Sequence, residues 1–533
     1  MISGKIQMKN LMLSALIAGV CVVGPAFAVS GDAEKGKEIY MKRCVWCHGE
    51  EGDGESAATE RLNPPPRDFT SGMYKIKTSG RDDMVPNDED IFRMIKFGMP
   101  GSHKSKEVSI NPGGTAMPGW GDMLSDKDIW DLVATVKEFS EYTDEKPEAQ
   151  VDYSDQISSS PDSIEKGKEL FNESERCTEC HGSDGKGDAI KALKGDAGDR
   201  TWPRNLTKAW TFRGSNSPKD IFTRITTGIP GTQMPSFADP SSKKSLSAED
   251  RWHVANYVNS LAKTVKVVDP SNSVIQAGLM EGDLPSDPND PQWEEAAQTT
   301  YFVMPQFIGK ERHFTPANDT ITMKALFNAT DIALLFEWDD RTKSVPGDEM
   351  AIKVADPDEV YEDAVAIQMP VTIPKSVQLP YFGMGDISHP VNIWQWKVGT
   401  TEKPESIELM NSTGFANIER RDAAKAGIEI KSAYSNGTWK VVMKRSRTTD
   451  DAENDLQFEE GKFIPVAFAT WDGSNNETGS KHTMTTWYWL ILKAPVGAKP
   501  TIMAILFAGI ALGGLIWWAR SAVAARREED EAA

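Results

Sequence analysis

The most hydrophobic stretch of the chain lies close to its C-terminus, where residues 501–519 contain no charged side chain. As an α-helix with a rise of about 1.5 Å per residue, this stretch extends about 28 Å, close to the thickness of a bilayer core. A buried core helix is the alternative, but such a helix is seldom apolar on every side. Two aromatic rings and then three arginines close the stretch: Trp517, Trp518, Arg520, Arg526 and Arg527. We therefore predict a transmembrane helix at 501–519 with a cytoplasmic tail at 520–533.

The N-terminus has the pattern of a secretory signal. Lys5 and Lys9 precede a mostly apolar segment, and Ala26-Phe27-Ala28 is a small-residue cleavage pattern. A retained membrane anchor and a lipidated Cys21 are the alternatives. The residue before Cys21 is Val20, where a lipoprotein signal usually has a small side chain. Cleavage of a signal peptide at 1–28 is therefore favoured, which predicts a single-pass protein of the cytoplasmic membrane with most of its chain in the periplasm.

The segment between these two ends changes its hydrophobic period once. Residues 31–145 and 160–265 have helical patterns, separated by a hydrophilic linker at 144–161. Beyond residue 270 short runs rich in β-branched and aromatic residues follow turn signals, as at Ser435-Asn436-Gly437. The predicted fold is multidomain: two all-α domains, then an all-β sandwich at 270–497, then the transmembrane helix.

The charge balance narrows the choice of partners. The 533 residues include 59 basic and 79 acidic side chains. Binding to nucleic acid requires a basic surface, so we expect no nucleic-acid partner. The acidic surface suits solubility and contact with other proteins.

Cysteine usage points to one cofactor. Apart from Cys21, all cysteines lie in two copies of one pentapeptide, 44–48 and 177–181: Cys44, Cys47 and His48, then Cys177, Cys180 and His181. C-x-x-C-H is the signature of covalent haem c attachment, because two thiols bond the porphyrin and the adjacent His reaches the iron. A disulfide, a zinc site or a thioredoxin-like redox pair would not require His after both pairs. The repeated signature predicts two covalent haem c groups.

An internal repeat identifies the second iron ligands. The segments 34–40 and 165–171 match, and so do 66–70 and 203–207. In the same alignment Met99 falls on an isoleucine, whereas Met117 and Met234 fall on each other, each before Pro and an aromatic residue. His and Met together are the ligands of electron-carrying cytochromes c, so Met117 and Met234 are the predicted sixth ligands.

These motifs resemble class I cytochromes c over residues 31–145 and 160–265. The resemblance implies a first helix that ends in the C-x-x-C-H motif, a Met-Pro ligand loop and a closing helix. It also implies that an Arg after Pro hydrogen-bonds a haem propionate, which would be Arg67 and Arg204. Ordinary solvated arginines are the alternative for both positions.

The β-rich region contains no Cys, so any cofactor there is non-covalent. Residues 378–385, 391–396 and 465–473 resemble the haem b-binding domain of the gamma subunits of ethylbenzene and dimethylsulfide dehydrogenases and of selenate and chlorate reductases. Related domains occur in nitrite oxidoreductases. The resemblance implies one haem b held by a Met and a Lys, which fall on Met384 and Lys481, with His482 as a rival. The alternative makes Met384 a packing residue and Lys481 a surface charge.

The predicted domains and the two family resemblances leave three functions open. The leading one is a non-catalytic electron-transfer subunit, like the gamma subunit of nitrite oxidoreductase-type complexes, whose implied redox partner is a molybdenum and iron–sulfur oxidoreductase. A dihaem peroxidase-type enzyme would have to release Met117 or Met234 from iron. A cytochrome with a carbohydrate-binding sandwich is the third.

Overall fold

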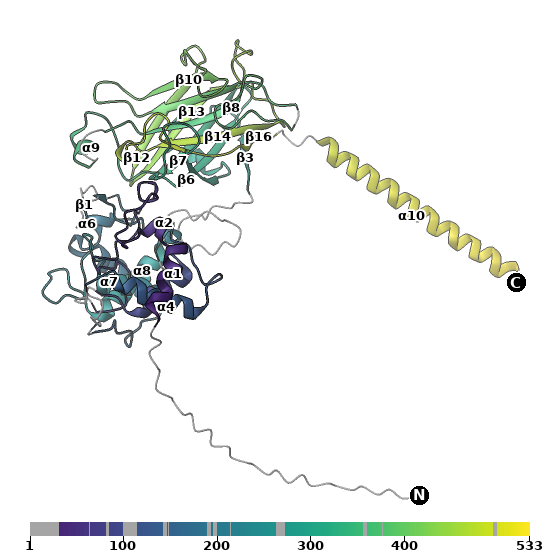
Figure 1. Cartoon of the computed structure of the whole chain (residues 1–533). Helices are drawn as coiled ribbons and strands as arrows, with labels where there is room; N and C mark the ends of the chain where they lie inside the picture. The colour runs from purple at the N-terminus through teal and green to yellow at the C-terminus, as the bar shows by residue number, and fades with distance from the viewer. Residues whose placement is uncertain are drawn as a thin grey trace, which may run out of the picture.

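A computed structural model (Figure 1) describes residues 31–62, 64–80, 85–99, 115–141, 147, 149–188, 193–195, 200–213, 215–262, 272–354, 360–375, 377–493 and 498–532. The predicted signal peptide lies outside the described residues. The N-terminal half is helical, a large sheet forms most of the C-terminal half, and one long apolar helix follows.

The first helical unit contains α1 (Ala33–Arg43), α2 (Val45–His48), the 3-10 turn η1 (Thr59–Arg61), α3 (Asp88–Phe97) and α4 (Asp126–Glu138). A capping box opens α4: Asp128 N–H donates to Ser125 Oγ, and Ser125 N–H donates to the Asp128 carboxylate. The apolar faces of α3 and α4 meet over Ile91, Ile129 and Val133 to form a core of their own.

The second unit repeats this order with α5 (Pro161–Asn172), η2 (Glu173–Glu175), α6 (Thr178–His181), η3 (Ala209–Thr211), α7 (Pro218–Thr227) and α8 (Ala248–Leu261), plus the short strands β1 (Leu193–Lys194) and β2 (Arg200–Thr201). In both units a glycine lets the first and last helices cross closely. A Cβ on Gly36 would lie 2.0 Å from the Asp131 carbonyl oxygen, and one on Gly167 would lie 2.0 Å from that of His253. The duplicated glycine of the sequence repeat is therefore a packing requirement.

Part of the predicted linker packs against these units instead of spanning free space. Gln150 pairs with Ser79 in an isolated β-bridge, and its side-chain amide donates to Asn87 Oδ1 at 2.7 Å. Val151 is buried in the core of the second unit. The helical units also meet directly, because an Arg224 guanidinium N–H donates to the Lys77 carbonyl oxygen at 3.3 Å.

The short segments 304–305 and 483–484 pair with each other, and the other strands of the β-rich region form one sheet folded over on itself. Its strand order is β11-β10-β9-β8-β14-β16-β3-β6-β7-β13-β12, with β4 beside β6. The strands are β3 (Val274–Leu279), β4 (Thr299–Phe302), β5 (Met304–Pro305), β6 (Thr320–Phe327), β7 (Asp331–Asp339), β8 (Ala364–Pro370), β9 (Val391–Lys397), β10 (Ser406–Ser412), β11 (Ile418–Arg421), β12 (Glu429–Ser435), β13 (Thr438–Ser446), β14 (Phe463–Trp471), β15 (Thr483–Met484) and β16 (Tyr488–Leu492). Short helices lie between them: η4 (Pro291–Glu294), α9 (Glu349–Val354) and η5 (Gly473–Asn475).

Strand β14 turns the corner between the two layers. Its first half, from Phe463 to Val466, pairs with β16, and its second half, from Ala467 to Trp471, pairs with β8. Trp396 of β9 and Trp439 of β13 are far apart in the strand order, yet their ring centroids lie 5.0 Å apart. The two layers therefore face each other around one apolar core, which is the arrangement of a β-sandwich.

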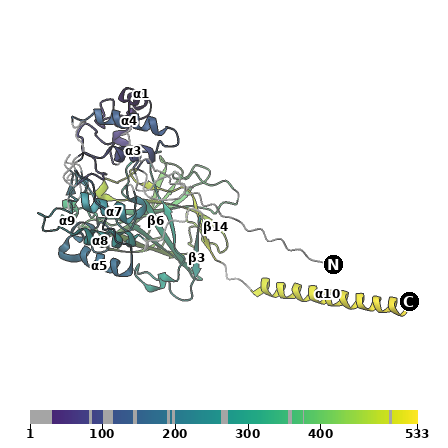
Figure 2. The same ribbon diagram turned by 90° about the horizontal axis from the view of Figure 1, so that it is seen from below.

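The last helix, α10 (Ala498–Ala532), projects away from the rest of the molecule (Figures 1 and 2). Among the described residues it is the one helix long and apolar enough to cross a membrane, over Ile502–Arg527, and none of that window is buried. The apolar stretch predicted at 501–519 lies inside α10.

The sandwich sits on the helical half through polar contacts. Lys208 Nζ donates to Asp319 Oδ1 at 2.6 Å and lies 3.2 Å from Asp339 Oδ2. Lys186 Nζ donates to Thr438 Oγ1 at 2.9 Å. These contacts attach one end of each of the strands β6, β7 and β13 to the second helical unit.

Candidate haem site

One continuous cavity of about 1380 Å³ contains both pentapeptide motifs. Small-molecule sites usually measure about 300–1,000 Å³, so this space suits a larger occupant or more than one. Every residue predicted for the two haem c sites lines it: Cys44, Cys47, His48, Arg67, Met117, Cys177, Cys180, His181, Arg204 and Met234. The folding of two units onto each other thus brings the two predicted sites into one space.

The two histidines have the same backbone contact. His48 Nδ1 lies 3.3 Å from the Arg67 carbonyl oxygen, and His181 Nδ1 lies 2.9 Å from that of Arg204. A carbonyl only accepts, so Nδ1 carries the proton in both rings and Nε2 keeps its lone pair. Burial lowers the pKa of both imidazoles, which favours the neutral form that binds metal. Both rings therefore leave Nε2 available to a metal ion.

The paired thiols do not have the properties of a redox-active site. All four cysteines are free. Burial is the largest influence on Cys44 and Cys177 and raises the pKa of each to about 12. The reactive thiol of a thioredoxin-like pair has a lowered pKa instead. In each motif the first cysteine caps a short helix that contains the second cysteine and ends at the histidine. Two thiols next to one imidazole fit a porphyrin held by two thioethers.

The two Met-Pro loops have the same fold. Met99 N–H donates to the Met117 carbonyl oxygen, and Ile229 N–H donates to that of Met234, each at 3.1 Å. The sequence alignment of Met99 with Ile229 is thus matched by equal hydrogen bonding.

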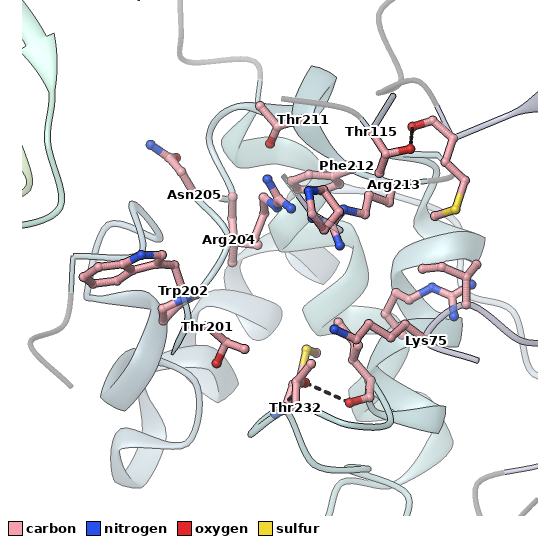
Figure 3. Close-up of a pocket in the computed structure, with 18 of the residues that line it drawn as sticks. Lys75, Thr115, Thr201, Trp202, Arg204, Asn205, Thr211, Phe212, Arg213 and Thr232 are labelled. Carbon is pink, nitrogen blue, oxygen red and sulfur yellow. Dashed lines mark hydrogen bonds between the residues drawn. The ribbon is translucent and has the colours of Figure 1, made fainter. Parts of the chain in front are cut away.

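A threonine supports each loop, and sequence reasoning missed it. Thr115 Oγ1 donates to the Met99 carbonyl oxygen at 3.1 Å, and Thr232 Oγ1 donates to that of Ile229 at 2.8 Å (Figure 3). The signal was present as Thr-x-Met-Pro in both copies. These threonines fix the loop that carries the predicted ligand.

Basic side chains gather on the cavity wall. Figure 3 shows Arg204 and Arg213 together at the pocket, with Trp202 to one side. Burial, and then the charges of neighbouring arginines, lower the pKa of Arg204 to about 9. Burial and the charge of Arg67 lower the pKa of Arg213 to about 10. Sequence reasoning identified Arg67 and Arg204 but missed Arg213, which has no C-x-x-C-H or Pro-Arg pattern around it.

The residues proposed for a third haem lie in a different place, on the outer face of the sandwich. Met384 has a positive φ of 69° and packs on a small apolar cluster that includes Ala364 and Trp471. The His482 ring lies 4.7 Å from the Trp471 ring, and its Nδ1 lies 2.6 Å from the Thr483 carbonyl oxygen.

Lys481 is only partly buried in that region. Its Nζ lies 3.3 Å from Glu311 Oε2, with the lysine side chain 30% exposed. Glu311 is itself mostly exposed, so this pair is weak and does not fix the lysine in place.

A buried acidic cluster in the sandwich was not predicted. Carboxylate oxygens of Asp340, Asp363 and Asp472 lie within 4.8 Å of one another. Burial raises the pKa of all three, that of Asp472 to about 6, and repulsion by Glu477 adds to the rise at Asp472. Repulsion within the cluster raises the pKa of Asp340 and Asp363 further. Among the described residues Asp340 Oδ2 has no hydrogen-bond partner. The cluster therefore favours bound protons at low pH.

Comparison with known families assigns three regions. Residues 31–134 match the model of the cbb3-type cytochrome c oxidase subunit III, and residues 164–262 match that of cytochrome c. Residues 290–428 and 413–483 match the ethylbenzene dehydrogenase model. The chain combines two cytochrome-type regions with one ethylbenzene dehydrogenase-type region. The family resemblance inferred from the sequence is confirmed, and the cytochrome-type regions imply covalent haem c.

Individual relatives match part of the chain. A protein of Haloferax mediterranei named as a respiratory nitrate reductase haem subunit is 25% identical over 46% of this chain and 83% of its own. The chlorate reductase subunit gamma of Ideonella dechloratans is 25% identical over 42% of this chain and 85% of its own. Among solved structures, a chain of the Kuenenia stuttgartiensis reducing HAO-like protein complex is 36% identical, with 43% of this chain and 96% of that chain covered and a TM-score of 0.38.

Proposed function

We propose that this chain is a membrane-anchored electron-transfer subunit of a respiratory oxidoreductase, carrying two covalent haem c groups and one non-covalent haem b. The observation that carries the proposal is the single cavity lined by both C-x-x-C-H motifs and both Met-Pro loops. Electron tunnelling weakens steeply with distance. Two redox groups inside one cavity therefore exchange electrons without a mobile carrier between them.

The residues divide the work of each c-type site. When bound, each haem supplies one-electron iron chemistry. Cys44, Cys47, Cys177 and Cys180 would hold the two porphyrins. His48 and Met117 would bind one iron, and His181 and Met234 the other. Because all positions on each iron are then taken by protein or porphyrin, the arrangement favours electron transfer over the peroxidase alternative.

For the sandwich we propose one haem b, bound by Met384 and Lys481. The amine of Lys481 binds iron only in its neutral form, so it would have to leave Glu311 and become desolvated. His482 is the competing ligand, since its Nε2 is left free by the Nδ1 contact. K481L and H482Q distinguish the two: the ligand's variant loses the extractable haem, and the other variant keeps it. Retention by both variants contradicts the proposal.

The relatives' names support the choice of complex. Haem subunits of nitrate and chlorate reductases are proteins that this chain resembles over about two-fifths of its length. By that resemblance we propose a molybdenum and iron–sulfur enzyme as redox partner, with a nitrite oxidoreductase-type complex as the specific candidate. We place the haem-bearing regions in the periplasm, where covalent haem attachment takes place, with α10 in the cytoplasmic membrane.

Anaerobic reductive titration of the full chain in detergent tests this function. We expect every c-type haem to remain low-spin in both redox states, with no carbon monoxide adduct and no peroxide turnover. Peroxide-dependent turnover by the purified protein would instead identify it as a peroxidase-type enzyme.

A further inference from the structure

The cavity of the two cytochrome-type regions has a third contributor. Besides residues of both helical units, its wall includes Asp319, Asp339, Asp340, Arg341 and Asp472 from the sandwich. Arg341 is the basic side chain of this group. It lies two residues after the end of β7, where Lys208 of the second helical unit contacts Asp339.

Arg341 reaches across the boundary between the modules. Its guanidinium carbon lies 5.5 Å from the ring centroid of Trp202, which belongs to the second helical unit. Its charge also acts on Arg204 of that unit. The backbone carbonyl of Arg204 in turn accepts from His181 Nδ1. Arg341 therefore belongs, by position, to the site of the second C-x-x-C-H motif.

The guanidinium of Arg341 lacks a carboxylate partner among the described residues. Asp472 and three further sandwich carboxylates act on its charge without forming an ion pair with it. Two of these three, Asp319 and Asp339, are contacted by Lys208. Arg204 and Arg213 likewise form no ion pair among the described residues, and Arg213 Nε is buried without a hydrogen-bond partner. Three guanidinium groups thus line one cavity without forming an ion pair among the described residues.

Buried cations require a counter-charge, and guanidinium groups bind carboxylates in a planar, bidentate way. A porphyrin attached at Cys177 and Cys180 would bring two propionate carboxylates into this cavity. These propionates would give the guanidinium groups a counter-charge in direct contact.

We propose that Arg341 is a positioning residue for the second haem c: supplied by the β-sandwich, it binds a propionate of the haem attached to Cys177 and Cys180. This inference rests on the proposed function. It implies that the sandwich does more than carry its own cofactor, since it completes a site in the neighbouring cytochrome-type region and sets the potential there.

The test compares R341Q, R341K and R420Q in the full chain purified in detergent, by spectroelectrochemical titration. Loss of a positive charge beside the haem stabilises the oxidised iron. In R341Q we expect the reduction potential of one c-type haem to fall by about 59 mV. For a one-electron couple this corresponds to about a tenfold change in the ratio of oxidised to reduced iron. The redox wave of the other haem stays in place.

R341K keeps the charge but loses the bidentate geometry, so it recovers most of the shift. R420Q removes an exposed arginine of the same module outside the cavity and leaves both waves unchanged. Haem content and thermal unfolding, measured on each variant, report any general damage to the fold.

The outcomes distinguish a failure of this inference from a failure of the proposed function. If R341Q retains both covalent haems and both potentials, the propionate contact is refuted while the electron-transfer proposal stands. An equal shift in R420Q, or no recovery in R341K, also refutes the contact. If the wild-type chain carries no covalent haem, the proposed function fails first.

Discussion

Replacement of Lys208 by Met should loosen the contact between the sandwich and the second helical unit. The Lys208 side chain is 9% exposed, and its Nζ lies 2.6 Å from Asp319 and 3.2 Å from Asp339. Met has a similar length, so K208M removes the charge with little change in volume. Two neighbouring carboxylates then lose the lysine that contacts both of them.

The magnitude follows from the burial of the pair. Removal of one partner from a buried ion pair costs about 3–5 kcal/mol, because the remaining charge is uncompensated. Asp339 is 33% exposed and regains some hydration, so we expect about 3 kcal/mol. Burial alone would lower the pKa of Lys208, but the charges of Asp319 and Asp339 outweigh it and raise the pKa above its ordinary value. The stabilisation is therefore fully present below about pH 10.4 and is lost as pH rises through the folded pKa.

Urea unfolding of the full chain at pH 7, followed through Trp fluorescence and the haem absorbance, measures the effect. The matched control is K431M, which breaks an exposed pair with Asp287 and should leave the unfolding midpoint almost unchanged. The triple variant K208M/D319N/D339N should recover much of the loss. A K208M midpoint indistinguishable from that of K431M would refute the reasoning.

Three further outcomes are expected. M117H and M234H should each lower the potential of one c-type wave, because the thioether ligand raises it, whereas M99L should leave both waves in place in the same titration. Because burial raises the pKa of Asp472 to about 6, the folded state holds this proton more tightly than the unfolded chain. The part of the stability that depends on Asp472 should therefore fall as pH rises from about 4 to about 6, and D472N should lose that part of the pH dependence when urea midpoints are compared. Deletion of residues 498–533 should move the protein from the membrane fraction to the soluble fraction after cell disruption, and retention in the membrane would contradict anchoring by α10.

Local patterns in the sequence predicted local structure well. The turn signal at Asn436-Gly437 joins β12 to β13. Both residues of that turn have positive φ, as this hairpin type requires. Such features depend on residues close together in the chain, so period and turn chemistry are sufficient to find them.

Long-range features could not be predicted in the same way. The repeat located the ligand candidates of each unit, but nothing in it indicated that the two sites share one cavity. Arg341 stands in an acidic loop of the sandwich, and its approach to Trp202 depends on how two modules dock. The parallel pairing of β3 with β16 and β6 likewise joins distant segments. For Met384 and Lys481 no covalent signature exists, so their role rests on resemblance alone.

The central claim is that the mature chain carries two covalent haems. A pyridine haemochrome spectrum with acid–acetone extraction, on protein made in a host able to attach haem c, measures this directly. We predict two haems that stay with the polypeptide and one that is extracted. Colourless protein with its four cysteines free or bridged would contradict the account.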